Sequence, residues 1–428
     1  MTTSMAITLG VTLVMAILFL SGKFPFGLVT MSCSLVLIAT GVLSLSEGFA
    51  GLTNQIVILI GAMFAMTGAL QKTNLPYMMS QLIGKLNGKS DNMLMAAMLI
   101  VFLVVSTVLP AEVVTLLLIS FVALLPEESA IKPSRVVLPC LLIGASWAFA
   151  FPVGLGATTD YTANVYMEGI VTDSSQFFVL GDLFKMRIIP TIVVMLYCFF
   201  IWRKVPVHDI NMESVSASQV KKSEMPMWRQ AIVYISFIAV IITMLFSGVF
   251  GTLMYYLPAI CVCVYGFTGI MNAKEIVNGV ACDTVWMLGG ILGVTTALTN
   301  TGAAALLGNL LLPLISWTNN GFLILLVICA FTAVMTTFLS NTGTWAVLAP
   351  LAASAAVAAG MDPRSLVAAV SISAMYSFCF PSGSTTCAFA YALGKYNPIK
   401  CLRFTVPLLI LMIISTAFSI SLIFPPFG

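Results

Sequence analysis

Apolar residues run along this chain in blocks of about 20, long enough as helices to cross a bilayer core of roughly 30 Å. Short polar connections separate the blocks from one end of the chain to the other. In the first half the pattern predicts spans near 5–22, 25–44 and 54–71, a hairpin near 92–126, a broken helix near 136–168 and a span near 187–202. In the second half it predicts spans near 230–247, 252–270 and 284–299, a hairpin near 320–358, a broken helix near 365–394 and a last span near 403–424.

Composition agrees with this pattern. Hydrophobic residues make up 60% of the chain and charged residues 8%, with a mean hydropathy of +1.09. A soluble domain carries about 25% charged residues, so the chain is predicted to be an all-α polytopic membrane protein. It has ten cysteines but no CxxC pair, and one histidine, so no Cys/His metal site is expected. We therefore expect no cofactor and no nucleic-acid partner, with the lipid bilayer as the surroundings.

The sequence indicates an internal duplication. One long polar segment, 203–229, separates a first repeat (1–202) from a second repeat (230–428). Gly61 recurs as Gly289, and Phe151-Pro152 as Phe380-Pro381, each about 230 residues later, and an offset that persists between distant segments indicates a repeat.

Each repeat contains a polar interruption inside a membrane-length apolar run. In the second repeat it is Ser340-Asn341-Thr342, and in the first it is Pro110-Ala111-Glu112. Paired interruptions of this kind indicate a binding site at the bilayer midplane, formed where two repeats meet. If each hairpin is re-entrant, a repeat crosses the membrane five times. An odd number of crossings gives the two repeats inverted topology.

The distribution of positive charge supports this topology. With the 203–229 linker in the cytoplasm, only three of the 18 Lys and Arg residues fall in connections on the opposite side: Lys185, Arg187 and Arg364. Such an excess on one side is what the positive-inside rule describes. We therefore expect a multi-pass protein of the plasma (inner) membrane, with the linker cytoplasmic and both termini outside.

The interruptions carry chemistry suited to ions. A break in a helix exposes carbonyl oxygens on one side and N–H groups at a helix start on the other. Carbonyl and hydroxyl oxygens suit a hard cation such as Na⁺, and the N–H groups suit an anion. A simpler interpretation is that Ser340-Asn341-Thr342 only caps the second hairpin helix. Even so, irregular backbone at membrane depth indicates a cavity.

These motifs resemble the divalent anion/sodium symporters, a family of the ion transporter superfamily. Phe338-Leu339-Ser340-Asn341-Thr342 is similar to the hairpin-tip motif of that family. Phe380-Pro381-Ser382-Gly383-Ser384-Thr385-Thr386 and Gly154-Leu155-Gly156-Ala157-Thr158 resemble its broken-helix motifs. The resemblance implies a homodimer and a cation site in each repeat. It places cations at Thr336, Ser340, Asn341, Gly383, Ser106 and Gly156, with Na⁺ itself at Ser340, Asn341 and Gly383. Glu112 and Asp160 are further candidates for binding Na⁺ or H⁺, because of their carboxylates and not because of the resemblance. It places the anionic substrate at Asn341, Thr342, Ser384, Thr385, Glu112 and Thr158.

The first repeat departs from the family pattern. Pro110-Ala111-Glu112 replaces its Ser-Asn-Thr, Asp160 replaces an Asn, and Cys387 replaces the matching Asn of the second repeat. Carboxylates at membrane depth are functional candidates, and no Lys or Arg partner is expected for Glu112 or Asp160 at that depth. They could ligate a cation, or carry a proton. Alternatively, Asp160 caps a half-helix while Glu112 faces a water-filled vestibule.

Three classes of function remain in competition. The leading one is a secondary transporter that couples Na⁺ to uptake of a small organic anion, such as a di- or tricarboxylate, by alternating access. The alternative within the same fold is a Na⁺/H⁺ or other cation/proton antiporter that uses Glu112 and Asp160. An intramembrane enzyme is not expected, because the chain has no HExxH motif and no nucleotide-binding loop. A channel is the remaining class, although duplicated broken helices favour alternating access.

Overall fold

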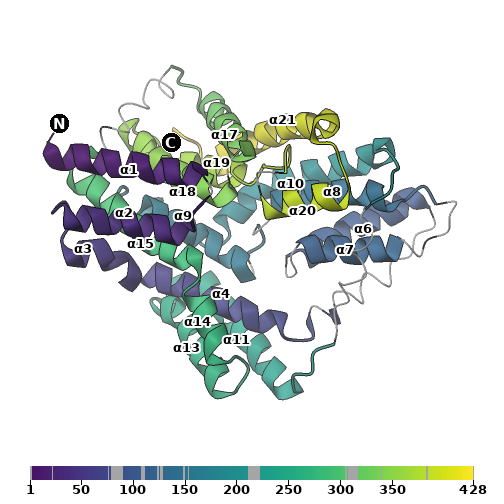
Figure 1. The fold of residues 1–428 in the computed structure, drawn as a ribbon, viewed down its shortest axis with the longest axis horizontal. Helices are drawn as coiled ribbons and strands as arrows, with labels where there is room; N and C mark the ends of the chain where they lie inside the picture. The colour runs from purple at the N-terminus through teal and green to yellow at the C-terminus, as the bar shows by residue number, and fades with distance from the viewer. Residues whose placement is uncertain are drawn as a thin grey trace.

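The protein is described by a computed structural model, drawn in Figure 1. It describes residues 2–21, 23–75, 77–78, 90–107, 111–122, 125, 129–147, 150–152, 154–210, 222–303, 306, 317–338, 340–381 and 384–427. Regular structure in these segments is helical, apart from one isolated bridge between Glu168 and Val171.

Helices follow the apolar blocks predicted from the sequence. In the first half they are α1 (Thr3–Ser21), α2 (Phe26–Ala39), α3 (Leu45–Phe49), η1 (Ala50–Thr53), α4 (Gln55–Gln71), α6 (Asp91–Val105), α7 (Ala111–Val122), α8 (Pro133–Trp147), η2 (Gly154–Thr158), α9 (Thr159–Met167), η3 (Ser174–Gln176), α10 (Asp182–Ile201) and η4 (Trp202–Lys204). In the second half they are α11 (Met227–Leu245), α12 (Ser247–Phe250), α13 (Leu253–Phe267), α14 (Ala273–Val280), α15 (Asp283–Asn300), α17 (Gly321–Phe338), α18 (Asn341–Ala358), α19 (Pro363–Ser373), α20 (Thr385–Leu393) and α21 (Pro398–Ile423).

Length and composition identify membrane-spanning helices directly. Among the described residues, five helical stretches are long and apolar enough to cross a bilayer: Leu45–Gln71, Asp182–Lys204, Met227–Met244, Ala273–Asn300 and Pro398–Ile423. Several shorter apolar helices accompany them, α1, α2 and α6 among them. The predicted class, an all-α polytopic membrane protein, is confirmed.

Helices of the two halves interleave in space. On one side of the molecule α15 packs along α2 and α3, and α13 and α14 pack on α4. On the other side α8 contacts α7, α10 and α20, while α21 contacts α10 and α17. The helices α9 and α18 connect the two groups, because α9 contacts α4 and α15 as well as α18 and α19. The repeat boundaries at 202/203 and 229/230 stay predictions.

Close backbone approach holds α15 against its neighbours. A side chain on Gly290 would lie 2.5 Å from the carbonyl carbon of Thr30 in α2, and one on Gly289 would lie 2.8 Å from the Leu52 side chain in η1. Only glycine leaves room for contacts of this kind. The Gly289-Gly290 pair therefore serves helix packing between the two halves.

Polar contacts join connections that the predicted topology assigns to the same side. On the side predicted to be cytoplasmic, Lys72 pairs with Glu275 at 2.9 Å, and the Asn74 N–H donates to Gln230 Oε1. On the opposite side, the Asn54 amide donates to Glu168. These contacts agree with the predicted order of crossings, but which face is cytoplasmic stays a prediction.

Each hairpin begins and ends at one place. In the first, both Ser129 Oγ and the Ala130 N–H, which follow α7, donate to the Asp91 carboxylate at the start of α6. In the second, Gly321 at the start of α17 lies against Pro426, whose carbonyl also accepts the N–H of Asp362 just after α18. Whether the two hairpins are re-entrant in the membrane stays a prediction.

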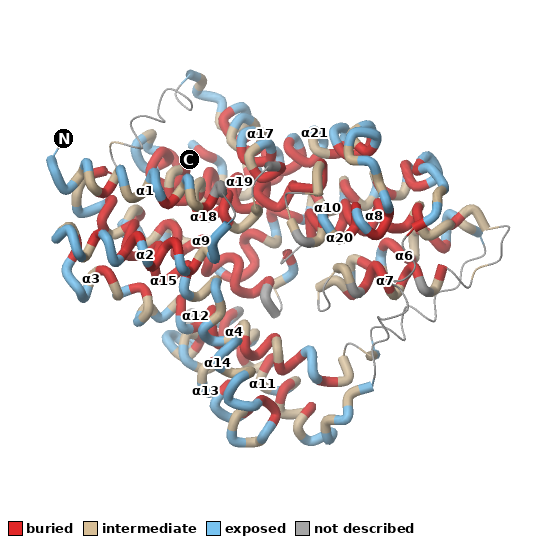
Figure 2. Tube along the Cα trace, in the orientation of Figure 1, coloured by how far each residue is buried: buried red, intermediate tan, exposed pale blue. Residues whose placement is uncertain are grey.

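Burial is concentrated where the broken helices cross the middle of the molecule (Figure 2). Every residue of α9 is buried, and so is almost all of α19, whereas α14 has no buried residue. Asn341, which begins α18, lies beside this best-packed part of the fold, because α18 contacts both α9 and α19.

Candidate functional site

The tip of the second hairpin is a helix start at membrane depth. Helix α17 ends at Phe338 and α18 begins at Asn341, with Ser340 between them in an extended conformation. Ser340 Oγ accepts a hydrogen bond from the Gly343 N–H at 3.1 Å. Ser340 is therefore the N-cap of α18, and Asn341 and Thr342 stand in its first turn.

Three oxygen atoms converge beside this tip. Thr336, in the last turn of α17 and fully buried, has its Oγ1 3.0 Å from Asn341 Oδ1 and 2.6 Å from the carbonyl oxygen of Ala374. Ala374 is the first residue after α19, where the second broken helix is interrupted. The Asn341 amide nitrogen lies 3.9 Å from Met375 Sδ. Hairpin and break thus meet through Thr336 and Asn341, while the predicted contact of Asn341 with Gly383 falls on a residue outside the described ones.

The break between α19 and α20 is held by side chains from α20. The Tyr391 hydroxyl lies 3.1 Å from the Phe378 carbonyl oxygen and 2.9 Å from that of Cys379. It can therefore donate a hydrogen bond to a backbone carbonyl in the break. Ser384 Oγ caps α20 by accepting the Cys387 N–H at 3.2 Å. Ser384 therefore has a structural role in addition to its predicted substrate contact. The Thr385 side chain is outside the described residues.

Glu112 lies at the start of α7 and contacts the other half of the chain. Thr386 Oγ1, in the first turn of α20, donates to Glu112 Oε1 at 2.6 Å. Both side chains are half-buried. The predicted substrate-facing carboxylate thus contacts the second broken helix at Thr386, a residue of the predicted broken-helix motif that was not predicted to be a site residue.

Asp160 has different partners. It is 1% exposed, and its two oxygens accept the N–H groups of Gly181 and Leu183, at 2.7 and 2.8 Å, at the start of α10. This arrangement favours the capping interpretation of Asp160. Arg187, also in α10 and 3% exposed, interacts electrostatically with Asp160 and with Tyr376 of the second break. One expectation was therefore wrong: Arg187 is a buried helix residue, not a charge in an outer connection.

The other first-half predictions have local contacts. Ser106 Oγ donates to the Leu103 carbonyl at 3.1 Å, at the end of α6. The Gly156 carbonyl accepts the Thr159 hydroxyl at 2.8 Å, and Thr158 is buried where α9 begins. Their assignment to cation and substrate sites stays a prediction, and Pro110 lies outside the described residues.

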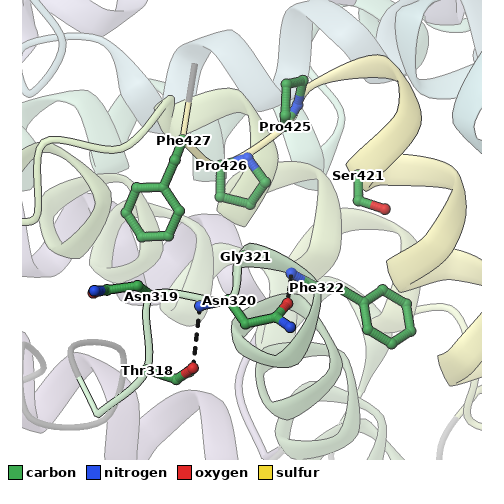
Figure 3. A pocket seen from close by; sticks show the side chains of 9 residues that line it. All are labelled: Thr318, Asn319, Asn320, Gly321, Phe322, Ser421, Pro425, Pro426 and Phe427. Atoms are coloured by element: carbon green, nitrogen blue, oxygen red, sulfur yellow. Dashed lines mark hydrogen bonds between the residues drawn. The ribbon is translucent and has the colours of Figure 1, made fainter.

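A cavity of about 630 Å³ lies at the far end of the second hairpin (Figure 3). Asn319 and Phe427 border it, and Asn320 Oδ1 caps α17 by accepting the Phe322 N–H. Its Gly321 edge stands about 15 residues, or roughly 22 Å of helix, from Thr336. The cavity is therefore separate from the oxygen cluster.

A sequence model of the citrate transporter family matches residues 16–374, well over half of the chain. The chain belongs to the citrate transporter family. This membership confirms the resemblance to ion-transporter-superfamily proteins.

Curated proteins similar in sequence to this citrate transporter family member include transporters. An uncharacterized transporter of Synechocystis sp. is 27% identical over 37% of this chain and 26% of its own length. Sodium/sulfate cotransporter 1 of Chlamydomonas reinhardtii is 28% identical over 30% of this chain and 15% of its own length. The chain thus spans about a quarter or less of the length of these two relatives.

Solved transporter structures share the fold. The YdaH transporter of Alcanivorax borkumensis matches 92% of this chain and 89% of its own, with a TM-score of 0.59 and 14% identity. MtrF of Neisseria gonorrhoeae matches 92% and 85%, with a TM-score of 0.60 and 16% identity. At these identities the likeness concerns the architecture alone.

Proposed function

We propose that this protein couples Na⁺ to the uptake of a small anion, either a di- or tricarboxylate or sulfate, by alternating access. The observation that carries the proposal is the convergence of Thr336 Oγ1, Asn341 Oδ1 and the Ala374 carbonyl oxygen between hairpin and break. Oxygen ligands of this kind suit a hard cation, and broken helices are where transporters place such sites. The sodium/sulfate cotransporter among the relatives supports both the ion and the range of anions.

The substrate would bind beside this cation site. Asn341 and Thr342 begin α18 and Ser384 caps α20, so the positive ends of two helices are available to an anion near the tip. Neutral hydroxyl and amide groups orient an anion without the desolvation cost of a buried charge. Family membership and these helix starts support carboxylates and sulfate as the anions to test first.

Uptake in proteoliposomes tests the proposal. We expect labelled sulfate, succinate or citrate to accumulate when an inward Na⁺ gradient is imposed, and not with an equal K⁺ gradient. Asn341→Ala removes the amide oxygen next to Thr336, and losing one such ligand costs about 1–3 kcal/mol, or roughly a tenfold to hundredfold loss of Na⁺ affinity.

Asn319→Ala is the matched control, because this exposed amide lies at the opposite end of the hairpin. It should leave uptake unchanged. Full Na⁺-dependent uptake by Asn341→Ala would contradict the cation site. Proton release on adding Na⁺, with no requirement for an anion, would instead favour the antiporter.

The resemblance also supports a homodimer embedded in the plasma membrane as the working unit. Light scattering of the purified protein should give twice the 45.7 kDa mass of one chain after subtraction of detergent. A monomer mass at all protein concentrations would contradict this.

A further inference from the structure

Glu112 is a carboxylate held where the two halves of the protein meet. Its Oε1 accepts the Thr386 hydroxyl at 2.6 Å, across 274 residues of sequence. The contact also brings its charge close enough to act on Cys387, the next residue of α20. Glu112 is therefore positioned by an element of the proposed anion site, Ser384-Thr385-Thr386, and not only by its own hairpin.

Packing beneath this contact is tight. A side chain on Gly144 of α8 would lie 2.9 Å from Ala111 Cβ and 3.6 Å from Thr386 Cγ2. The absence of a side chain there allows the first turns of α7 and α20 to approach each other over α8, and all three helices are in mutual contact. The fold thus fixes the position of Glu112 through backbone packing on both sides.

The charge of Glu112 conflicts with anion binding nearby. Glu112 stands at the repeat position that corresponds to Thr342, a neutral residue predicted to contact the substrate. Like charges a few ångströms apart repel strongly wherever water is partly excluded. An anion arriving at Thr386 must therefore replace the carboxylate that is already hydrogen-bonded there.

We propose that Glu112 is a specificity-determining residue, an internal carboxylate that occupies the Thr386 hydroxyl and competes with the incoming anion for it. This inference rests on the proposed anion transport and adds that Glu112 discriminates among anions by their charge. Anions of lower negative charge displace Glu112 with less repulsion, whereas multiply charged anions bind less tightly than they would beside a neutral side chain. The residue limits the affinity of the site without being a ligand of the substrate.

Neutralising Glu112 should therefore improve binding. Binding of sulfate, succinate and citrate is measured by calorimetry on the purified full-length protein with saturating Na⁺. We expect Glu112→Gln, which keeps the shape and the acceptor oxygen, to bind at least one of these anions about tenfold or more tightly than the wild type. The gain should be larger for citrate than for a singly charged probe such as acetate.

Further variants separate the effect of the Glu112 charge on anion binding from the effect of its hydrogen bond with Thr386. Glu112→Asp keeps the charge but shortens the side chain, and it should show no such gain. In the Glu112→Gln background, Thr386→Val should weaken anion binding several-fold, because an anion can displace the neutral amide oxygen and accept the Thr386 hydroxyl in its place, while Thr386→Ser should not. Glu224→Gln, which neutralises an exposed linker carboxylate, is the control for net charge and should match the wild type.

The outcomes distinguish failure of this inference from failure of the proposed transport function. Unchanged or weaker anion binding in Glu112→Gln, with normal binding by the wild type, overturns the inference alone. If neither the wild type nor Glu112→Gln binds any of the anions, the inference and the proposed function both fail. A loss of binding cannot be confused with the expected result, because damage to the fold does not raise affinity.

Discussion

Asp160 is a buried carboxylate with two backbone donors and one cationic neighbour. Both of its oxygens are used at the start of α10, and Arg187 lies in the same buried region. Asp160→Asn would replace one acceptor oxygen by an NH₂ group and would remove a negative charge that acts on Arg187. We expect a loss of about 3 kcal/mol in stability, seen as a lower melting temperature in detergent.

Two further variants test whether the loss of stability is specific to Asp160 and its interaction with Arg187. Asp173→Asn alters an exposed carboxylate whose side chain caps the short η3, and it should cost about 1 kcal/mol or less. Combining Asp160→Asn with Arg187→Met removes both charges and should recover part of the loss. Additive losses in the double variant would show that the two charges do not stabilise each other.

Sequence reasoning found the polar residues of the site but not all of their partners. Asn341 and Glu112 stood out because polar groups are costly inside apolar runs. Arg187 was misplaced because the span was expected to begin at residue 187, whereas α10 begins at Asp182. Thr386 could not be paired with Glu112 because the contact depends on how helices of opposite halves pack, which no local pattern encodes.

At the scale of elements, packing between α2 and α15 allows a direct test. Gly290→Ala would place a methyl group 2.5 Å from the backbone of Thr30, so one helix must move away. Overpacking of this kind costs about 1–3 kcal/mol, to be measured by thermal unfolding in detergent.

Gly10 in α1 is the matched position, since a side chain there would meet nothing within 4 Å. Gly10→Ala should leave the melting temperature unchanged or slightly raised. Equal effects of the two substitutions would contradict close packing as the role of Gly290.

Breaks and long helices were predictable, while the short helices were not. Hairpins and broken helices were predicted from their polar interruptions. The structure ends α17 at Phe338, next to the predicted hairpin tip, but it ends α19 at Ser373, before the predicted motif at 380–386, inside which α20 begins. The connections now seen as α3 and α14 were not predicted to be helical. Both begin with a capping box, at Ser44 and Asn272, but helices of five and eight residues are marginal alone and depend on packing, as α14 does on α4.

At the scale of the whole molecule, the predicted orientation is testable by chemical labelling. Ser175 and Asp209 are both exposed and lie in connections predicted to face opposite sides of the membrane. In intact cells a membrane-impermeant maleimide should modify Ser175→Cys and spare Asp209→Cys, and inverted vesicles should show the reverse. The unmodified protein reports any background from its own cysteines. A reversed pattern would place the linker outside.

The pairing of α15 with α2 and α3 also affects how the chain is made. When a ribosome has inserted the helices as far as α4, which ends at Gln71, its partner α15 is still more than 200 residues from being translated. Helix α15 is the element that packs against Gly51 and Thr30. Until α15 is inserted, the surfaces of α2 and η1 that pack against it are exposed to lipid. Membrane quality control would encounter the nascent protein in this state, so substitutions in α15 should reduce yield through degradation of a half-assembled chain.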